Sequence, residues 1–155
     1  SYSKYLEYIE VQENLVQNID PEWVNDVLYA KDVLLRGREA SEQINILGDD
    51  GVPVEYHERF WKSEVIDFII LQQDGFDTID QSTPMDRQKY MLNLVLGICR
   101  SSFQFNSFED VNPYFKQVID KLKQMNYSEF HSKDFNRFEE ELKALLHKQE
   151  VVHAD

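Results

Sequence analysis

Residues 68–80 read FIILQQDGFDTID, where an apolar run meets two glutamines, an Asp-Gly pair and a single phenylalanine among acids. The side chain of Phe76 could offer a flat apolar face to a planar ligand. Gln72 and Gln73 would then supply amide groups that both donate and accept hydrogen bonds. An ordinary alternative stays open, because an Asp-Gly pair is also typical of a helix C-terminus, with Phe76 folding back onto the core.

A second candidate site is acidic. Residues 48–58 read GDDGVPVEYHE and contain no lysine or arginine. Their four carboxylates belong to Asp49, Asp50, Glu55 and Glu58. A solvated turn between two helices would explain the Asp and Gly residues. A protruding loop that meets a basic partner would explain them equally well, because charge at a loop tip attracts an opposite charge over about 8–10 Å.

Several kinds of catalytic and metal chemistry lack their motifs. The sequence contains no GxxxxGK[ST] or GxGxxG loop for phosphate and no GxSxG nucleophile elbow. Cys99, the single cysteine, lies on an apolar helical stripe, where a thiolate would be poorly stabilised. Glu150 and His153 have the spacing of a carboxylate di-iron helix, but that site requires a second such pair and two more glutamates. We therefore predict no catalytic residue and no metal ligand, and a carboxylate-bridged metal enzyme is the least favoured function.

The charge balance restricts the partners. With 16 Lys+Arg and 29 Asp+Glu in 155 residues, the net charge is −13, which repels nucleic acid and anionic membranes and favours basic protein surfaces. No stretch approaches the roughly 18 apolar residues of a membrane span, and the first residues do not resemble a signal peptide. A single cysteine cannot form an intrachain disulfide, which fits a reducing compartment. The chain does not begin with methionine, which fits either trimming or a domain of a longer protein.

The apolar periodicity predicts an all-α fold, a bundle of about six helices with short loops. We expect the bundle to span residues 1–148, followed by a frayed tail at 149–155. The predicted helices are 3–17, 21–47, one from Pro53 to the Asp-Gly pair, one from Pro84, one from Asn112-Pro113 to about 125, and 132–148. Gly37 weakens the second of these helices and allows a bend there.

The segment LQQDGFDTID, residues 71–80, resembles a signature in the C-terminal domain of the catalytic A subunit of rotary A/V-type ATPases. Other segments resemble that domain in the same order: SYSKYLEY, DPEWVN, LLRGREASEQINILGDDGVP, QKYMLNLVL and FEEELKALL. The resemblance covers roughly residues 1–148. It departs from the family at Gly75, where alanine is usual, and at Gln81-Ser82, where the family has Tyr-Cys. The turn at GDDG is one residue short, and residues 101–124 match only in helical character.

This resemblance implies a domain without catalytic activity of its own. In the family, ATP or ADP and magnesium bind a central domain with a P-loop lysine and a catalytic glutamate, and this sequence contains no such loop. The chain would therefore be the C-terminal helical domain of a longer subunit, inactive alone and with no cofactor of its own. The resemblance also places Phe76 near the adenine pocket, with Gln73 and Gly75 as its neighbours.

The same resemblance implies a mechanical role. In the family, this domain faces the central stalk and moves between open and closed positions as the nucleotide changes. The acidic residues of 48–58 are then the candidate rotor contact, with the B subunit and the central stalk as partners in a complex on the cytoplasmic face of a membrane. The ions moved would be protons or sodium. The alternative is a free-standing α-helical adaptor that binds a basic protein partner and has no connection to nucleotides.

Overall fold

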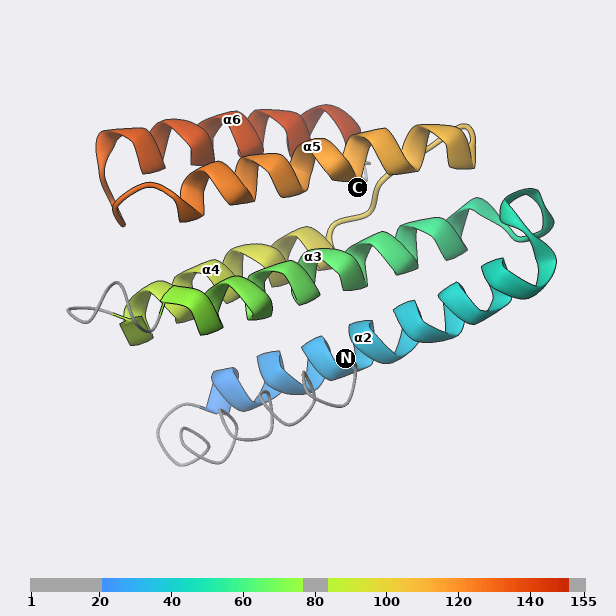
Figure 1. Ribbon diagram of the computed structural model, residues 1–155, viewed down its shortest axis with the longest axis horizontal. Helices are drawn as coiled ribbons and strands as arrows, with labels where there is room; N and C mark the ends of the chain where they lie inside the picture. The colour runs from blue at the N-terminus through green and yellow to red at the C-terminus, as the bar shows by residue number, and fades with distance from the viewer. Residues whose placement is uncertain (1–20, 77–83, 151–155) are drawn as a thin grey trace, which may run out of the picture.

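The computed structural model describes residues 21–76 and 84–150, and within these ranges it confirms the all-α prediction (Figure 1). The helices are α2 (Pro21–Leu47), α3 (Val54–Phe76), α4 (Pro84–Arg100), α5 (Phe108–Asn126) and α6 (Lys133–Gln149), with a 3-10 turn, η1 (Asp49–Gly51), between α2 and α3. The predicted helix over 3–17 lies outside the described residues. Most of the predicted tail does too, although α6 includes Gln149.

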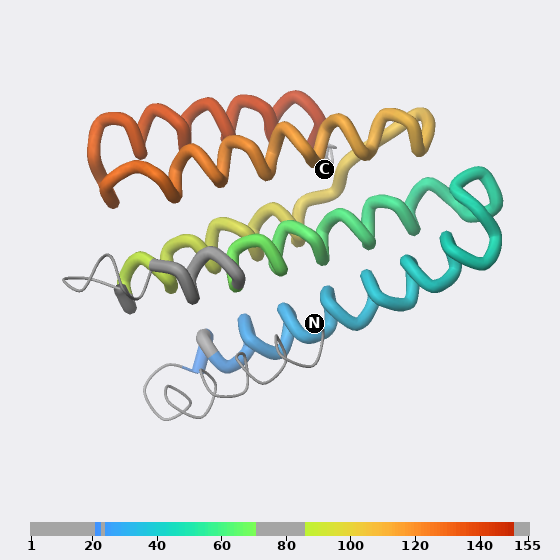
Figure 2. Tube along the Cα trace, in the orientation of Figure 1, coloured from blue at the N-terminus to red at the C-terminus, as the bar shows by residue number. Residues whose placement is uncertain are grey.

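The central element is α3, which packs against α2, α4 and α5. The antiparallel pair α5 and α6 forms one layer of the molecule, and α2, α3 and α4 form the other, as the chain trace shows (Figure 2). The middle of α3 is accordingly apolar on several sides, with Val65, Ile66, Ile69 and Ile70 all buried. Because α2 and α3 are joined by a short turn at one end of the molecule, they form a long helical hairpin.

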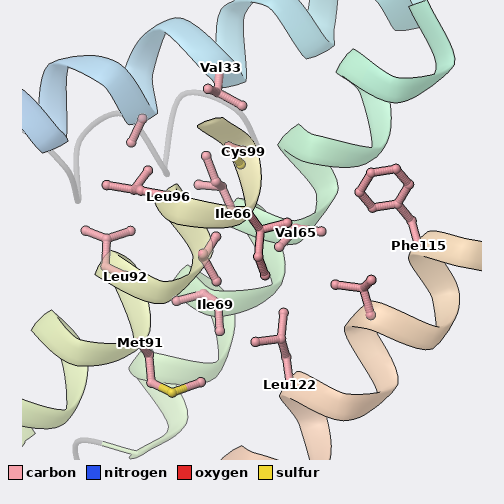
Figure 3. Close-up of a cluster of buried hydrophobic side chains, with 14 of the residues drawn as sticks. Val33, Val65, Ile66, Ile69, Met91, Leu92, Leu96, Cys99, Phe115 and Leu122 are labelled. Carbon is pink, nitrogen blue, oxygen red and sulfur yellow. The ribbon is translucent and has the colours of Figure 1, made fainter. Parts of the chain in front are cut away.

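The core fills the space between the two layers and continues among α2, α3 and α4 (Figure 3). Its largest fully buried side chains include Phe115, Phe135, Ile66, Ile69, Met91, Leu96, Ile98, Leu122, Met125 and Leu142. Trp61 of α3 stacks on Phe115 of α5 with ring centroids 6.4 Å apart, and this contact joins the layers. Burial of this much apolar surface is the main source of stability in such a bundle.

The predicted start of α5 at Asn112-Pro113 is wrong. The helix begins at Phe108, and the Ser107 side chain caps it by accepting a hydrogen bond from the Glu109 backbone N–H at 3.1 Å. Pro113 lies inside the helix, in its second turn. The serine cap and the acids of the first turn stabilise the start enough for the helix to accommodate the proline.

Gly37 does not interrupt α2, which is continuous over 27 residues. The glycine is buried against α3, and a Cβ added to it would overlap the side chain of Ser63 and lie 3.2 Å from the Arg59 carbonyl oxygen. The missing side chain therefore lets the two helices approach closely. At the other end of α3, the helix runs through Gly75 to Phe76, so the predicted stop at the Asp-Gly pair falls one residue early.

A buried arginine at the start of α4 joins the two layers. One terminal nitrogen of Arg87, Nη2, donates to the backbone carbonyls of Met125, Asn126 and Ser128 at 3.2, 2.8 and 3.0 Å. These carbonyls belong to the end of α5 and the turn that follows, where helical hydrogen bonding ceases. Arg87 is only 6% exposed, so its charge is largely shielded from water.

Candidate functional site

The acidic loop is built around one glycine. Gly48 follows α2 with a φ of 85°, a left-handed conformation that favours glycine. Its N–H donates to the Ile44 carbonyl at 2.8 Å, and the Gly51 N–H donates back to the Gly48 carbonyl at 3.0 Å. The chain therefore reverses within η1, and Asp49 and Asp50 lie exposed at the tip of the α2–α3 hairpin.

The four predicted acidic residues do not share one environment. Asp49, Asp50 and Glu55 are exposed around the turn. The side chain of Glu58 is only 15% exposed and forms an ion pair with Lys62 at 3.1 Å. Lys62 also donates to the Ser101 carbonyl at 2.8 Å, so this pair holds α3 to the end of α4. Glu58 therefore differs from the other three acids in being largely buried, and its charge is matched by Lys62.

His57 connects the loop to α5, and this link was not predicted from the sequence. Its Nε2 lies 2.9 Å from the Asp49 carbonyl oxygen, and its ring stacks on Phe108 with centroids 5.2 Å apart. The residue is 7% exposed. One local pattern could have indicated that α5 begins at Phe108. The sequence Ser-Phe-Glu-Asp places a capping residue before two acids, which is typical of a helix start. Through His57, the first turn of α5 comes to lie beside η1.

An open cleft of about 590 Å³ lies between the ends of these elements, and we call it the end cleft. It is lined by Ser41, Ile44, Asn45, Asp49, His57, Phe60, Trp61, Phe108, Glu109, Asn112, Pro113 and Lys116, from α2, η1, α3 and α5. Two carboxylates, Asp49 and Glu109, thus share a cleft with several aromatic side chains. Of the four predicted acids, only Asp49 is among its lining residues, and the other lining residues were not predicted as site residues.

The predicted adenine-facing residues lie at the end of α3. The backbones of Gln73, Gly75 and Phe76 are helical, and their side chains lie outside the described part of the structure, as do residues 77–83. The start of the next helix at Pro84 agrees with the prediction. The placement of Phe76 near a nucleotide therefore stays a prediction.

The thiol of Cys99 is unsuited to nucleophilic chemistry. Burial raises its pKa to about 12, and its Sγ lies 3.6 Å from the Lys62 carbonyl oxygen. Within residues 21–76 and 84–150, no three His, Cys, Asp or Glu side chains come together as metal ligands. The described helices include none that is long and apolar enough to span a bilayer.

One carboxylate of α3 is held in an unfavourable environment. Burial, and then the charge of Glu64 one turn earlier, raises the pKa of Asp67 to about 7 from its ordinary value of 3.8. Its Oδ1 is buried without a hydrogen-bond partner in the described structure. The folded protein therefore keeps this carboxyl protonated up to about pH 7, whereas the unfolded chain releases the proton near pH 4.

Asp67→Asn should stabilise the protein at pH 8 and not at pH 3.5. Because the folded pKa is raised, the stability contributed by protonated Asp67 is complete below pH 3.8 and is lost as the pH rises to about 7. An amide removes that loss, and partial exposure limits the gain to about 2 kcal/mol. Chemical denaturation from pH 3 to 8 measures it. Equal stabilisation at both ends of the range would contradict the assignment.

Comparison with known proteins finds relatives along the length of the chain. The V-type ATP synthase alpha chain of Chlamydia muridarum is 34% identical over 155 residues, 99% of this chain and 26% of the relative. The protein of the same name from Chlamydia abortus is 33% identical over the same shares. That of Borrelia duttonii is 31% identical over 123 residues, 79% of this chain and 21% of the relative. No protein-family model and no solved structure matches.

These matches define the class first: the chain is an all-α relative of one subunit of V-type ATP synthases. It belongs to the V-type ATP synthase alpha chain family and corresponds to the C-terminal domain of that subunit, as the resemblance to the catalytic A subunit implied. The chain spans about a quarter of the length of these relatives, between 21% and 26%.

Proposed function

We propose that this domain is the moving arm of a rotary ATPase catalytic subunit. The whole subunit would bind ATP or ADP with magnesium and couple hydrolysis or synthesis to the transport of protons or sodium ions. The domain would close on the nucleotide site at one end and contact the central stalk at the other. The relationship to V-type ATP synthase alpha chains over nearly all of the chain carries this proposal and disfavours the free-standing adaptor.

The shape of the α2–α3 hairpin supports a mechanical role. With 27 and 23 residues, the two helices extend about 40 and 35 Å at 1.5 Å per residue. The acidic turn lies at one end of this hairpin, and the predicted adenine-facing residues at the end of α3 lie at the other (Figure 1). A densely packed helical layer transmits displacement with little deformation. A displacement at the acidic turn would therefore also displace the far end of α3.

The outer surface of α2 supports assembly with other protein parts. Its exposed large apolar side chains are Leu28, Leu35, Ile46 and Leu47, at 50%, 44%, 74% and 56% exposure. Four such residues on one helix favour burial against neighbouring protein. The remaining three quarters of the subunit and the B subunit are the partners that we propose for this surface, in a complex attached to the cytoplasmic face of a membrane.

Phe76→Ala should weaken ATP binding by the assembled ATPase about fivefold. Loss of an aromatic face against adenine costs roughly 1 kcal/mol, which corresponds to that factor. Equilibrium binding of ATP to the assembled complex measures the effect. Tyr56→Ala is the matched control, because this aromatic residue lies in the first turn of α3, about 30 Å along the helix from Phe76, and its loss should leave affinity unchanged. Equal ATP affinity in all three proteins would remove Phe76 from the nucleotide site.

Reversing the charges of Asp49 and Asp50 to lysine should reduce ion pumping per ATP hydrolysed and leave ATP affinity intact. Like charges facing each other at an interface cost on the order of 2 kcal/mol or more, so the stalk contact should weaken at least about tenfold. Proton or sodium uptake by vesicles, divided by the rate of hydrolysis, measures the coupling. The control is Glu129→Lys with Glu140→Lys, which makes the same charge change at exposed positions around α6. Full coupling in the Asp49/Asp50 variant would rule out the rotor contact.

A further inference from the structure

We infer that the end cleft is the docking site for a basic segment of the central stalk, which inserts an apolar side chain between the loop and α5. This inference rests on the proposed function, because it names the chemistry of the stalk surface that the domain meets. It extends the contact beyond the loop to a cleft that the first turns of α3 and α5 complete.

The apolar half of the recognition comes from three helices. Ile44 of α2, Phe60 and Trp61 of α3, and Phe108 and Pro113 of α5 all line the cleft. Its volume of about 590 Å³ lies within the roughly 300–1,000 Å³ of typical ligand pockets, and one side is open to solvent. An open apolar cleft between helix ends suits a side chain carried by another protein, as in helix-in-groove recognition.

The charged half comes from the cleft mouth. Asp49 and Glu109 line it, and their exposed sequence neighbours Asp50 and Asp110 add two further carboxylates. The one basic lining residue is Lys116, seven residues and about 10 Å along α5 from Glu109. The mouth is therefore negative, and a partner with lysine or arginine beside its apolar anchor is complementary to it.

Acids in the first turn of a helix also stabilise that helix, so charge alone does not identify a partner. The second observation is the bridge made by His57. His57 is only 7% exposed, its ring nitrogen Nε2 is hydrogen-bonded to the Asp49 carbonyl, and its ring stacks on Phe108. It thereby holds an acid from the hairpin and an acid from α5 around one aromatic-lined cleft. Charge and apolar surface are brought to the same place by a single packed residue.

A photo-activated cross-linking residue placed at Asn45 tests the partner in the assembled ATPase. Asn45 is exposed and lines the cleft, whereas Asn93 is exposed on α4 and serves as the matched control position. We expect attachment from position 45 alone, to a stalk segment with lysine or arginine beside an apolar residue. A complex that assembles and pumps but shows attachment elsewhere, or none, overturns this inference and leaves the proposed function standing. A chain that never enters the complex overturns both.

Binding of a synthetic helical peptide of leucine and lysine to the 155-residue chain separates the cleft from general charge attraction. Asn112→Trp fills the cleft with a bulky side chain, and Glu109→Lys reverses a charge at its mouth. Each should weaken binding about tenfold, while the controls Asn93→Trp and Glu140→Lys should change it less than about twofold. Weakening by Glu109→Lys without weakening by Asn112→Trp would show attraction by charge alone and would overturn the docking site.

Discussion

Replacing Arg87 with methionine is expected to lower the free energy of unfolding by about 3 kcal/mol. Methionine fills much of the same volume but donates no hydrogen bonds. The carbonyls of Met125, Asn126 and Ser128 would lose the donor that they share, at distances of 2.8 to 3.2 Å. The guanidinium also lies over the rings of Phe130 and Phe135, at 5.9 and 5.8 Å, so aromatic contacts are lost with it. Denaturant titrations of the variant and the wild-type protein measure this difference in the free energy of unfolding.

Arg100→Met is the control for this result. Arg100 is 49% exposed, pairs with Asp26 at 2.9 Å and lies over the ring of Tyr29. Exposed pairs of this kind contribute at most about 1 kcal/mol, so its loss should be minor. Comparable destabilisation by the two substitutions would show that the buried hydrogen bonds of Arg87 stabilise the fold no more than the exposed ion pair of Arg100.

The helices were predictable because their signals are local. Asp20-Pro21 and Thr83-Pro84 mark the starts of α2 and α4 by cap and proline chemistry, and both helices begin at the proline. The start of α5 was missed for a related reason. Pro113 is as strong a local signal as the other two prolines, but the Ser107 cap and the packing of Phe108 on His57 start the helix earlier. The contact between Phe108 and His57 therefore favours the helix start marked by Ser107 over the one marked by Pro113.

The contacts between helices were not predictable from spacing along the chain. Nothing in the local sequence around Arg87 indicates that it bonds carbonyls about 40 residues away, at the end of α5. Glu58 looked equivalent to Asp49 as an acid of one loop, yet Lys62 one turn later pairs with it. The end cleft likewise depends on which helix ends meet in space. The acidic loop was visible in the sequence, whereas its apolar neighbourhood was not.

The proposed moving arm would need to be stiff, and its stiffness would depend on how α2 and α3 meet. Gly37 lies at that contact. The α5–α6 layer holds the opposite side of α3 through Trp61 and Phe115. The other neighbours of α3 are α4 and α5. A displacement of the hairpin tip therefore either moves α3 relative to α4 and α5 or moves all of these helices together. Close packing along α2 and α3 favours movement of the hairpin as one unit.

Gly37→Ala is expected to destabilise the protein by about 3 kcal/mol, although alanine is the better helix former by roughly 1 kcal/mol. The added methyl group would overlap the Ser63 side chain and crowd the Arg59 carbonyl, so α2 and α3 would have to separate. Gly97→Ala on α4 is the matched control. A Cβ there meets nothing within 4 Å, and the same substitution should stabilise by up to about 1 kcal/mol. Thermal and denaturant unfolding of both variants measure the two signs.

Combining Gly37→Ala with Ser63→Gly should recover most of the loss. Ser63→Gly removes both atoms that the new methyl group would overlap, at the cost of the Ser63 hydroxyl bond to the Phe60 carbonyl and about 1 kcal/mol of helix propensity. The two substitutions in one chain should therefore be less damaging than the sum of their separate effects by more than about 1 kcal/mol. Additive effects would mean that α2 and α3 do not meet at this pair of residues, and close packing of the hairpin would then lose its main support.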